Sequence, residues 1–352
     1  MSVGADRRQN SFIADQCRRA GYLSVMQIHP LSFRAAVLSS QRFLCVLALL
    51  LLSGLAAVSA ASPEIFPAGV KRVVFLGDSI TYGGGYVCDI TAWLRTREPG
   101  RQCEIINVGL PSETVSGLSE PEHLTRYKFA RPDLHERLER VLAQIKPDLV
   151  IACYGMNDGI YLPLDEARFQ AFRDGIQWLH AAVEKGGAKI IHVTPPVFDE
   201  LKGGHPGYGA VLDKYSDWLV TQRAAGWQVI DLHTPMKQAL TAAREKDPTF
   251  AFAKDGIHPG ESGHWLMART ILTSLGATDV ADAATDLSML ARWRHGPEIL
   301  QLIRQQQAVM KDAWLTATGH KRPMRPGLPL AEAQAKAGEL EKQIKPLLDD
   351  KQ

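Results

Sequence analysis

Residues 72–79 read RVVFLGDS, and this segment decides the fold. A short apolar run, Arg72–Leu76, leads directly into Gly77-Asp78-Ser79, a set of residues typical of a tight turn. Four more runs of this kind follow along the chain: Glu104–Val108, Leu149–Tyr154, Lys189–Val193 and Gln228–Leu232. Runs that are short, β-branched and apolar throughout are typical of strands buried on both faces, as in a parallel sheet.

Longer stretches with helical spacing of apolar residues follow the second run and each later one: Pro132–Gln144, Leu164–Lys185, Tyr208–Ala225 and Pro235–Glu245. Gly186-Gly187 and Gly226 end two of them with residues that favour turns. Strands that alternate with helices indicate a parallel sheet with helices on both faces. We therefore predict an α/β fold, a three-layer, doubly wound sandwich around a parallel sheet of about five strands.

Composition places the chain among soluble globular proteins. Of its 352 residues, 45% are hydrophobic and 22% are charged, and the length suits one main domain with appendages. The formal net charge is +2 without a long basic run, which argues against nucleic acid as a partner and against electrostatic attachment to membranes. Neither CxxC nor HExxH occurs, so we predict no required metal and no cofactor.

An export signal is predicted near the N-terminus. Arg34 and Arg42 precede the apolar run Phe43–Leu52, and the small residues Val58-Ser59-Ala60 follow it. This order is typical of a secretory signal peptide cut near residue 60 or 61. An uncleaved membrane anchor is the alternative, but it requires about 20 apolar residues. We predict an exported protein, periplasmic or extracellular, with no stable membrane span after cleavage.

The predicted division of the chain has three parts: residues 1–61 as leader and signal peptide, 62–280 as the α/β domain, and 281–352 as a C-terminal helical extension. Met26 is a candidate for the true start because the segment before it is polar. In the extension, helical stretches at Asp286–Leu315 and Pro329–Leu348 flank the Pro-rich link Lys321–Gly327. We expect the extension to pack on the domain; an arm that binds a partner is the alternative.

Three of the five cysteines lie after the predicted cleavage site. A Cys88–Cys103 bridge is possible in an exported protein, whereas Cys153 sits inside an apolar run and is expected to be a buried thiol. The other two, Cys17 and Cys45, would leave with the signal peptide.

A serine, a histidine and an aspartate form the candidate catalytic set. Ser79 follows the first predicted strand, and residues at the carboxyl ends of parallel strands meet at one edge of the sheet. A serine hydroxyl needs an adjacent base that a third group orients. His258 lies in a tight loop three residues after Asp255, whose carboxylate can hold the ring. The alternatives are an ordinary turn at Ser79, and a capping aspartate with a surface histidine.

Asn157 is the candidate for stabilising negative charge on a carbonyl oxygen. It lies in Gly155-Met156-Asn157-Asp158-Gly159, directly after the third predicted strand. A fixed donor aimed at that oxygen contributes roughly 3–4 kcal/mol to acyl transfer. A simple turn is the alternative for this loop. Asp158 beside it is expected to orient a loop or to touch the substrate.

Together these segments resemble the SGNH/GDSL hydrolase family over roughly Val73–Leu275. Phe75–Thr81 is similar to the family's nucleophile block, Gly155–Asp158 to its GxND block and Asp255–Pro259 to its DxxHP block. The resemblance implies a flavodoxin-like SGNH hydrolase fold for the α/β domain. It also implies a serine esterase with Ser79, Asp255 and His258 as its triad.

The family's second block reads like N-x-G-x-x-G-D-T, in which the later glycine gives a backbone N–H to the oxyanion hole. Asn107 and Gly109 match it, but Ser112 stands where that glycine is expected. Any residue except proline can donate a backbone N–H, although the substitution puts the backbone angles at Ser112 in question. The resemblance implies an oxyanion hole made of the N–H groups of Ser79 and Ser112 and the side-chain amide of Asn157.

The resemblance further implies an exported carboxylic ester hydrolase that works through an acyl-enzyme. No long apolar lid is visible, so we expect short acyl groups, such as acetyl on carbohydrate, and a small-molecule or polysaccharide ester as partner. A catalytically silent carbohydrate-binding module on the same fold, or a lipase or thioesterase of the family, is the alternative. The lack of metal-ligand spacing disfavours a phosphodiesterase or phosphatase.

Four other polar residues are weaker candidates for a functional role. Tyr127 and Arg131 could bind a sugar or an acid group, although a solvated loop is the expectation for their segment. His192 lies inside an apolar strand and is expected to be a core histidine. His205 lies in a Gly-rich loop and is given no role.

Overall fold

The structure, a computed structural model, describes residues 64–352. The predicted leader and signal peptide, with Met26, Cys17 and Cys45, lies outside the described residues. No helix within residues 64–352 combines the length and the apolar character needed to cross a membrane.

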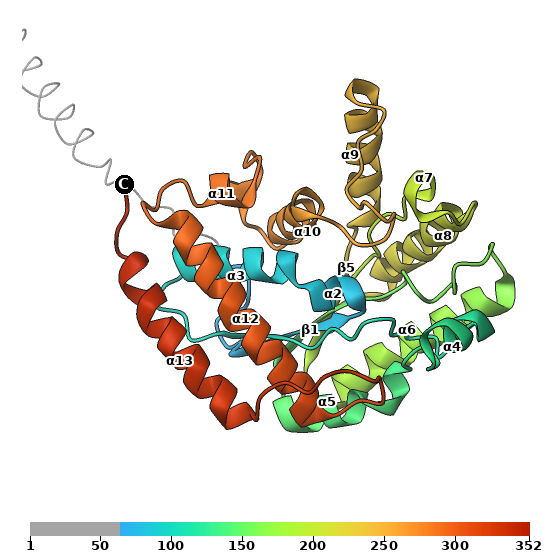
Figure 1. Ribbon diagram of the computed structural model, residues 1–352, viewed down its shortest axis with the longest axis horizontal. Helices are drawn as coiled ribbons and strands as arrows, with labels where there is room; N and C mark the ends of the chain where they lie inside the picture. The colour runs from blue at the N-terminus through green and yellow to red at the C-terminus, as the bar shows by residue number, and fades with distance from the viewer. Residues whose placement is uncertain (1–63) are drawn as a thin grey trace, which may run out of the picture. The chain divides into compact units, whose positions relative to one another are not determined.

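A five-stranded parallel sheet forms the middle layer, as predicted (Figure 1). Its order is β2-β1-β3-β4-β5, and the bounds are Arg72–Gly77 (β1), Glu104–Asn107 (β2), Leu149–Cys153 (β3), Lys189–Val193 (β4) and Gln228–Ile230 (β5). The chain moves from β1 to one side and then returns to the other side at β3. The loops after β1 and β3 therefore lie at the switch point where α/β sheets hold their ligands.

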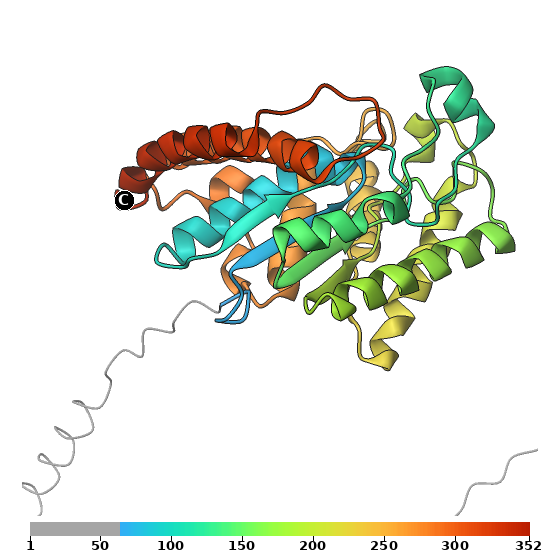
Figure 2. The same ribbon diagram turned by 90° about the horizontal axis from the view of Figure 1, so that it is seen from below.

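Helices cover both faces of the sheet, which confirms the three-layer prediction (Figures 1 and 2). One face carries α3 (Gly85–Arg97) and α10 (Glu261–Ser274); the other carries α5 (Leu138–Ile145), α6 (Glu166–Lys185) and α8 (Tyr208–Thr221). Right-handed crossovers account for this split. The connection from β1 to β2, which contains α3, runs across the sheet in one direction. The later connections, which contain α5, α6 and α8, run in the opposite direction and so place their helices on the other face.

The remaining helices lie at the ends and rims of these layers. They are α2 (Ser79–Gly83), α4 (Pro121–Tyr127), α7 (Glu200–Gly203), α9 (His233–Lys246), α11 (Asp286–Met289), α12 (Gly296–Thr318) and α13 (Leu330–Leu347). Short 3₁₀ turns lie at Leu134–Glu136, Gln222–Ala225 and Thr278–Val280.

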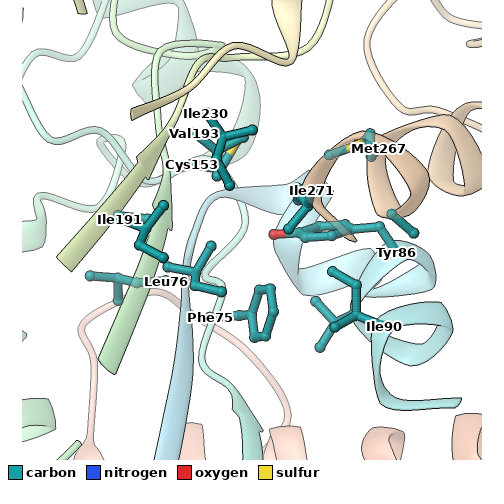
Figure 3. Close-up of a cluster of buried hydrophobic side chains, with 14 of the residues drawn as sticks. Phe75, Leu76, Tyr86, Ile90, Cys153, Ile191, Val193, Ile230, Met267 and Ile271 are labelled. Atoms are coloured by element: carbon teal, nitrogen blue, oxygen red, sulfur yellow. The ribbon is translucent and has the colours of Figure 1, made fainter. Parts of the chain in front are cut away.

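An apolar core lies between α3, α10 and the sheet (Figure 3). Tyr86 of α3 and Ile271 of α10 are fully buried, and the rings of Tyr86 and Phe75 meet edge-on with their centroids 5.7 Å apart. Burying one side chain of this size stabilises the fold by roughly 1.5–3 kcal/mol. The short helix α2 joins β1 to α3. The packing of α3 on the sheet therefore limits where α2, and with it Ser79, can lie.

Two sequence predictions for the helices are wrong. No helix is predicted between the first two strands, yet α2 and α3 lie there; ten of the thirteen residues of α3 are buried, so its apolar residues show no single helical face. The stretch Asp286–Leu315, predicted as one helix, is two: α11 ends at Met289, and α12 begins with Gly296-Pro297.

The C-terminal extension packs along the sheet edge formed by β2. Gln307 of α12 donates a hydrogen bond from Nε2 to the Ile105 carbonyl oxygen of β2, at 3.1 Å. Figure 2 shows α12 and α13 side by side over this edge. The ring N–H of Trp293 donates to the Leu348 carbonyl oxygen, at 3.1 Å, and ties the end of the chain to the start of the extension. An edge strand covered in this way cannot pair with another chain.

The described cysteines are all free thiols. Cys88 and Cys153 are buried and Cys103 is partly buried, so the possible Cys88–Cys103 bridge does not form. Burial raises the pKa of the Cys88 thiol to about 12, which keeps it protonated and unreactive.

Gly109→Ala is expected to lower the free energy of unfolding by about 1–3 kcal/mol. A Cβ at this position would lie 2.4 Å from the Tyr82 backbone nitrogen and 2.7 Å from the Thr81 carbonyl carbon. The loop after β2 and helix α2 would therefore have to separate. Denaturant titration followed by circular dichroism measures the loss.

Gly338→Ala is the matched control. Gly338 lies inside α13, and a Cβ there would meet no atom within 4 Å. Because alanine is the better helix former, this change should raise the free energy of unfolding by about 0.5–1 kcal/mol. Equal effects of the two substitutions would contradict the close approach at Gly109.

Candidate active site

Ser79 is the first residue of α2 and follows β1 with only Asp78 between them. Asp78 has extended backbone angles and caps the helix, because its carboxylate accepts a hydrogen bond from the Ile80 N–H at 2.9 Å. The sharp change from strand to helix places Ser79 at the carboxyl edge of the sheet. Its side chain lines the cavity described below.

The structure brings the three predicted residues of the triad together. His258 Nε2 lies 2.9 Å from Ser79 Oγ, and His258 Nδ1 lies 2.6 Å from Asp255 Oδ2. Asp255 Oδ1 also accepts the backbone N–H groups of Ile257 and His258, at 2.9 and 2.8 Å. Gly256 makes this tight loop possible, since its φ of 79° and its packing against the Gly203 backbone leave no room for a side chain.

Hydrogen bonds keep Asp255 ionised. Partial burial favours its neutral form, but the bonds from the His258 ring and from the two backbone N–H groups outweigh burial and hold the pKa of Asp255 below its ordinary value. A carboxylate at this place fixes the proton on His258 Nδ1 and leaves Nε2 free to accept a proton from Ser79.

Asn157 lies in the loop after β3, and its side-chain amide is held in one orientation. Its oxygen accepts hydrogen bonds from Arg131 Nη1 at 3.0 Å and from the Tyr161 hydroxyl at 3.2 Å. Its nitrogen donates to the Glu113 carbonyl oxygen at 3.2 Å. An amide nitrogen carries two N–H groups, so one is left to donate to a substrate in the cavity.

Arg131, Glu120 and Tyr161 form a support for Asn157 that the sequence analysis missed. Glu120 binds the Arg131 guanidinium through two hydrogen bonds, at 2.7 and 2.6 Å, and that group lies 5.2 Å from the Tyr161 ring centroid. The Arg131 side chain is only 7% exposed, so the expectation of a solvated loop is wrong for this residue. Tyr127, at 50% exposure, fits that expectation. No pattern in the sequence links Glu120 to Arg131.

Ser112 has the left-handed backbone conformation that glycine adopts most readily. Its φ is 67°, in the left-handed region that costs most residues about 1–2 kcal/mol. Ser112 lines the same cavity as Ser79 and Asn157. The loop therefore follows this course at an energetic cost.

Two buried acids hold this loop in place. Glu113 forms an ion pair with Arg137, at 2.6 Å, and accepts a hydrogen bond from the Tyr154 hydroxyl, also at 2.6 Å. Asp158 accepts the backbone N–H groups of Val115 and Ser116, each at 2.8 Å. Of the two expectations for Asp158, the structure thus supports the orientation of a loop. Burial raises its pKa to about 6, although these backbone bonds oppose the rise.

A cavity of about 480 Å³ opens beside Ser79 and His258. Its wall includes residues of α4 and the following loop, and also His205, Ile257 and Arg322. His192 lies elsewhere: it is fully buried and contacts the ring of His180 at 3.1 Å, as expected of a core histidine. Among residues 64–352, no three His, Cys, Asp or Glu side chains gather where they could hold a metal ion.

The GDSL-like Lipase/Acylhydrolase family model matches residues 75–266 of the chain. The chain belongs to this family. The match begins in β1 and ends in α10, so it includes the loops that carry Ser79, Ser112, Asn157 and His258. Membership supports an ester hydrolase. No curated protein matches the chain.

Several solved structures are similar to this GDSL-like chain. A gut microbial diltiazem-metabolizing enzyme is 23% identical, with a TM-score of 0.49 over 62% of this chain and 49% of its own, so the chain spans about half its length. A catalytic mutant of an acetylxylan esterase from Geobacillus stearothermophilus is 21% identical, with a TM-score of 0.45 over 60% of this chain and 97% of its own. An alpha/beta hydrolase enzyme from the metagenome of Lake Arreo, Spain, is 22% identical, with a TM-score of 0.43 over 60% and 98%.

Arg131→Gln is expected to lower kcat about tenfold or more while changing KM little. Removing an oxyanion donor outright costs about 10²–10³ in kcat, and this variant leaves the Asn157 amide present but free to turn. Tyr161→Phe removes the second donor to the same oxygen and should act in the same direction. Steady-state kinetics on an aryl acetate measure both values.

Asn157→Ala provides the reference for these variants. If Arg131 acts through Asn157, then Arg131→Gln in the Asn157→Ala background should cause little further loss of kcat. Additive losses in the double variant would show that Arg131 does not act through the amide.

Asp78→Asn is expected to stabilise the protein more at pH 8 than at pH 4. Burial raises the pKa of Asp78 to about 7, despite the Ile80 N–H bond, and the nearby Asp158 carboxylate adds to the rise. Ionising Asp78 in the folded protein is therefore unfavourable, and it lowers the free energy of unfolding as the pH rises from about 4 to 7. The total loss is at most about 4 kcal/mol. Asparagine keeps the cap without that cost. Denaturant titrations at several pH values test this; a gain that does not change with pH would contradict the raised pKa.

Proposed function

We propose that this member of the family is an exported serine esterase with Ser79 as nucleophile. The observation that carries the proposal is the line of hydrogen bonds from Asp255 through His258 to Ser79, which ends at a cavity. A binding module needs a cavity but not a base placed within 2.9 Å of a serine hydroxyl.

In the proposed reaction, His258 Nε2 takes the Ser79 proton while Ser79 Oγ attacks the ester carbonyl carbon. The carbonyl oxygen becomes an oxyanion, which the N–H groups of Ser79 and Ser112 and the amide of Asn157 stabilise. His258 then gives its proton to the departing alcohol, and an acyl-enzyme remains. Water, activated by His258, hydrolyses this ester and returns Ser79 to its starting state.

The proposed substrate is an ester of a short acyl group, such as acetyl, with a polar alcohol such as a carbohydrate. Support comes from the wall of the cavity, where charged and aromatic side chains outnumber aliphatic ones. Long acyl chains require an extended apolar surface, and the aliphatic side chains that line this cavity are few: Pro111, Ile160, Leu162 and Ile257. The proposed location, periplasmic or extracellular, rests on the signal-like segment before residue 62.

Ser79→Ala and His258→Ala should each lower kcat/KM by at least about 10³-fold on any ester that the wild type hydrolyses. A panel of acetyl, butyryl and longer aryl esters, with acetylated xylan and pectin, measures the activity and its dependence on acyl length. A fluorophosphonate should label the wild type at Ser79, as located by mass spectrometry, and should leave Ser79→Ala unlabelled.

Ser274→Ala is the matched control, since Ser274 is exposed at the end of α10, outside the cavity. It should retain wild-type activity and labelling. Folded wild-type protein that hydrolyses no member of the panel and takes no label would overturn the proposal in favour of a binding module.

A further inference from the structure

Three guanidinium groups line the cavity beside Ser79, and only one of them has a carboxylate partner. Arg131 is paired with Glu120. Among the described residues, neither Arg126 nor Arg322 has a carboxylate oxygen within 4.0 Å. Two cations in one cavity are therefore available to a ligand.

Arg322 is the more constrained of these two cations. Within residues 64–352, its side chain makes a single hydrogen bond, from Nη1 to the Pro323 carbonyl oxygen at 3.3 Å, and its guanidinium carbon lies 5.0 Å from the Phe129 ring centroid. The aromatic ring supports one side of the guanidinium, and Nε is buried without a hydrogen-bond partner among the described residues. Partial burial lowers the pKa of Arg322, so the group has lost part of its hydration without gaining a counter-charge.

Arg126 contributes less, because it is close to an acid. Glu122 lies one helical turn before it on α4 and lines the same cavity. The charges of these two residues largely offset each other. The unbalanced positive charge of the cavity is that of Arg322.

Arg322 belongs to the link between α12 and α13, far along the chain from the catalytic residues. In both views this link runs toward the side of the molecule where α4 lies (Figures 1 and 2). The C-terminal extension thus contributes a side chain to the cavity that contains Ser79 and His258.

We propose that Arg322 binds an anionic group, a carboxylate or a sulfate, on the alcohol part of the substrate. The inference rests on the proposed function and narrows it: the preferred esters are those of acidic alcohols, such as acetylated acidic oligosaccharides. A guanidinium suits either anion, because both present oxygens that can accept charge-assisted N–H bonds. With a short acyl group, the charged group lies on the alcohol side.

The test compares acetyl esters that differ in charge. Acetate release is measured from 4-acetoxybenzoate, from 4-acetoxybenzenesulfonate and from the neutral methyl 4-acetoxybenzoate, and then from acetylated galacturonan and xylan oligosaccharides. The readout is the ratio of kcat/KM for the anionic ester to that for the neutral one, which cancels differences in overall activity. The first two substrates distinguish a carboxylate from a sulfate-like group.

Arg322→Gln should lower this ratio about tenfold, the size expected for one charge-assisted hydrogen bond at a partly exposed site. Arg322→Lys should retain part of the preference, since it keeps the charge but loses the planar edge. Arg325→Gln is the matched control: it removes the same charge from the same link, at an exposed position outside the cavity, and should leave the ratio unchanged. Raising the salt concentration should lower the ratio in the wild type and not in Arg322→Gln.

Each result decides the matter. If Arg322→Gln hydrolyses all the esters with the same ratio as the wild type, this inference is overturned and the proposed function stands. If the ratio falls equally in Arg322→Gln and Arg325→Gln, the inference is also overturned, because the loss would then come from the lower net charge of the link and not from Arg322 itself. Folded wild-type protein that hydrolyses none of the esters overturns the proposed function and this inference with it.

Discussion

The buried ion pair between Glu113 and Arg137 holds together the loops that make the site. Both side chains are almost completely inaccessible to solvent, at 0% and 1% exposure. Arg137 also donates to the Val108 carbonyl oxygen, at 2.8 Å, and Glu113 accepts from Tyr154 at the end of β3. The pair thus joins the loop after β2, the end of β3 and the start of α5. Removing one partner of such a pair typically costs about 3–5 kcal/mol, because a buried charge is left alone.

The geometry at Asn157 depends on this pair through the backbone. The carbonyl oxygen of Glu113 accepts one N–H of the Asn157 amide, and the adjacent Asp158 holds Val115 and Ser116 of the same loop. Neighbours in sequence therefore have opposite tasks: Asn157 faces the cavity, and Asp158 faces the protein. The strained conformation of Ser112 persists because the loop is fixed on both sides of it: before it, the Val108 carbonyl oxygen accepts from Arg137, and after it, Glu113 pairs with Arg137.

Sequence reasoning succeeded where the information was local. The five strands follow from short apolar runs, and the contact between Asp255 and His258 follows from their spacing of three residues in a tight loop. The meeting of Ser79 with His258 required one further rule, that the carboxyl ends of parallel strands share one edge. The residues that support Asn157, namely Arg131, Glu120 and Tyr161, come together through contacts between separate segments, and no periodic pattern in the sequence indicates those contacts. Helix α3 was missed for a related reason, since burial on nearly all sides removes the amphipathic pattern.

The contacts of α12 with α2 have a consequence for where the folded unit of this protein ends. Asp312 accepts a hydrogen bond from the Tyr82 hydroxyl at 3.1 Å, and Lys311 donates to the Tyr82 carbonyl oxygen at 2.9 Å. Both bonds reach the far end of the short helix that begins with Ser79. A chain that stopped where the family match stops would lack them, and would leave the edge of β2 uncovered. The family match ends at residue 266, but the contacts that hold α2 extend beyond it. A border drawn where the match ends would therefore cut through the contacts that hold α2 in place.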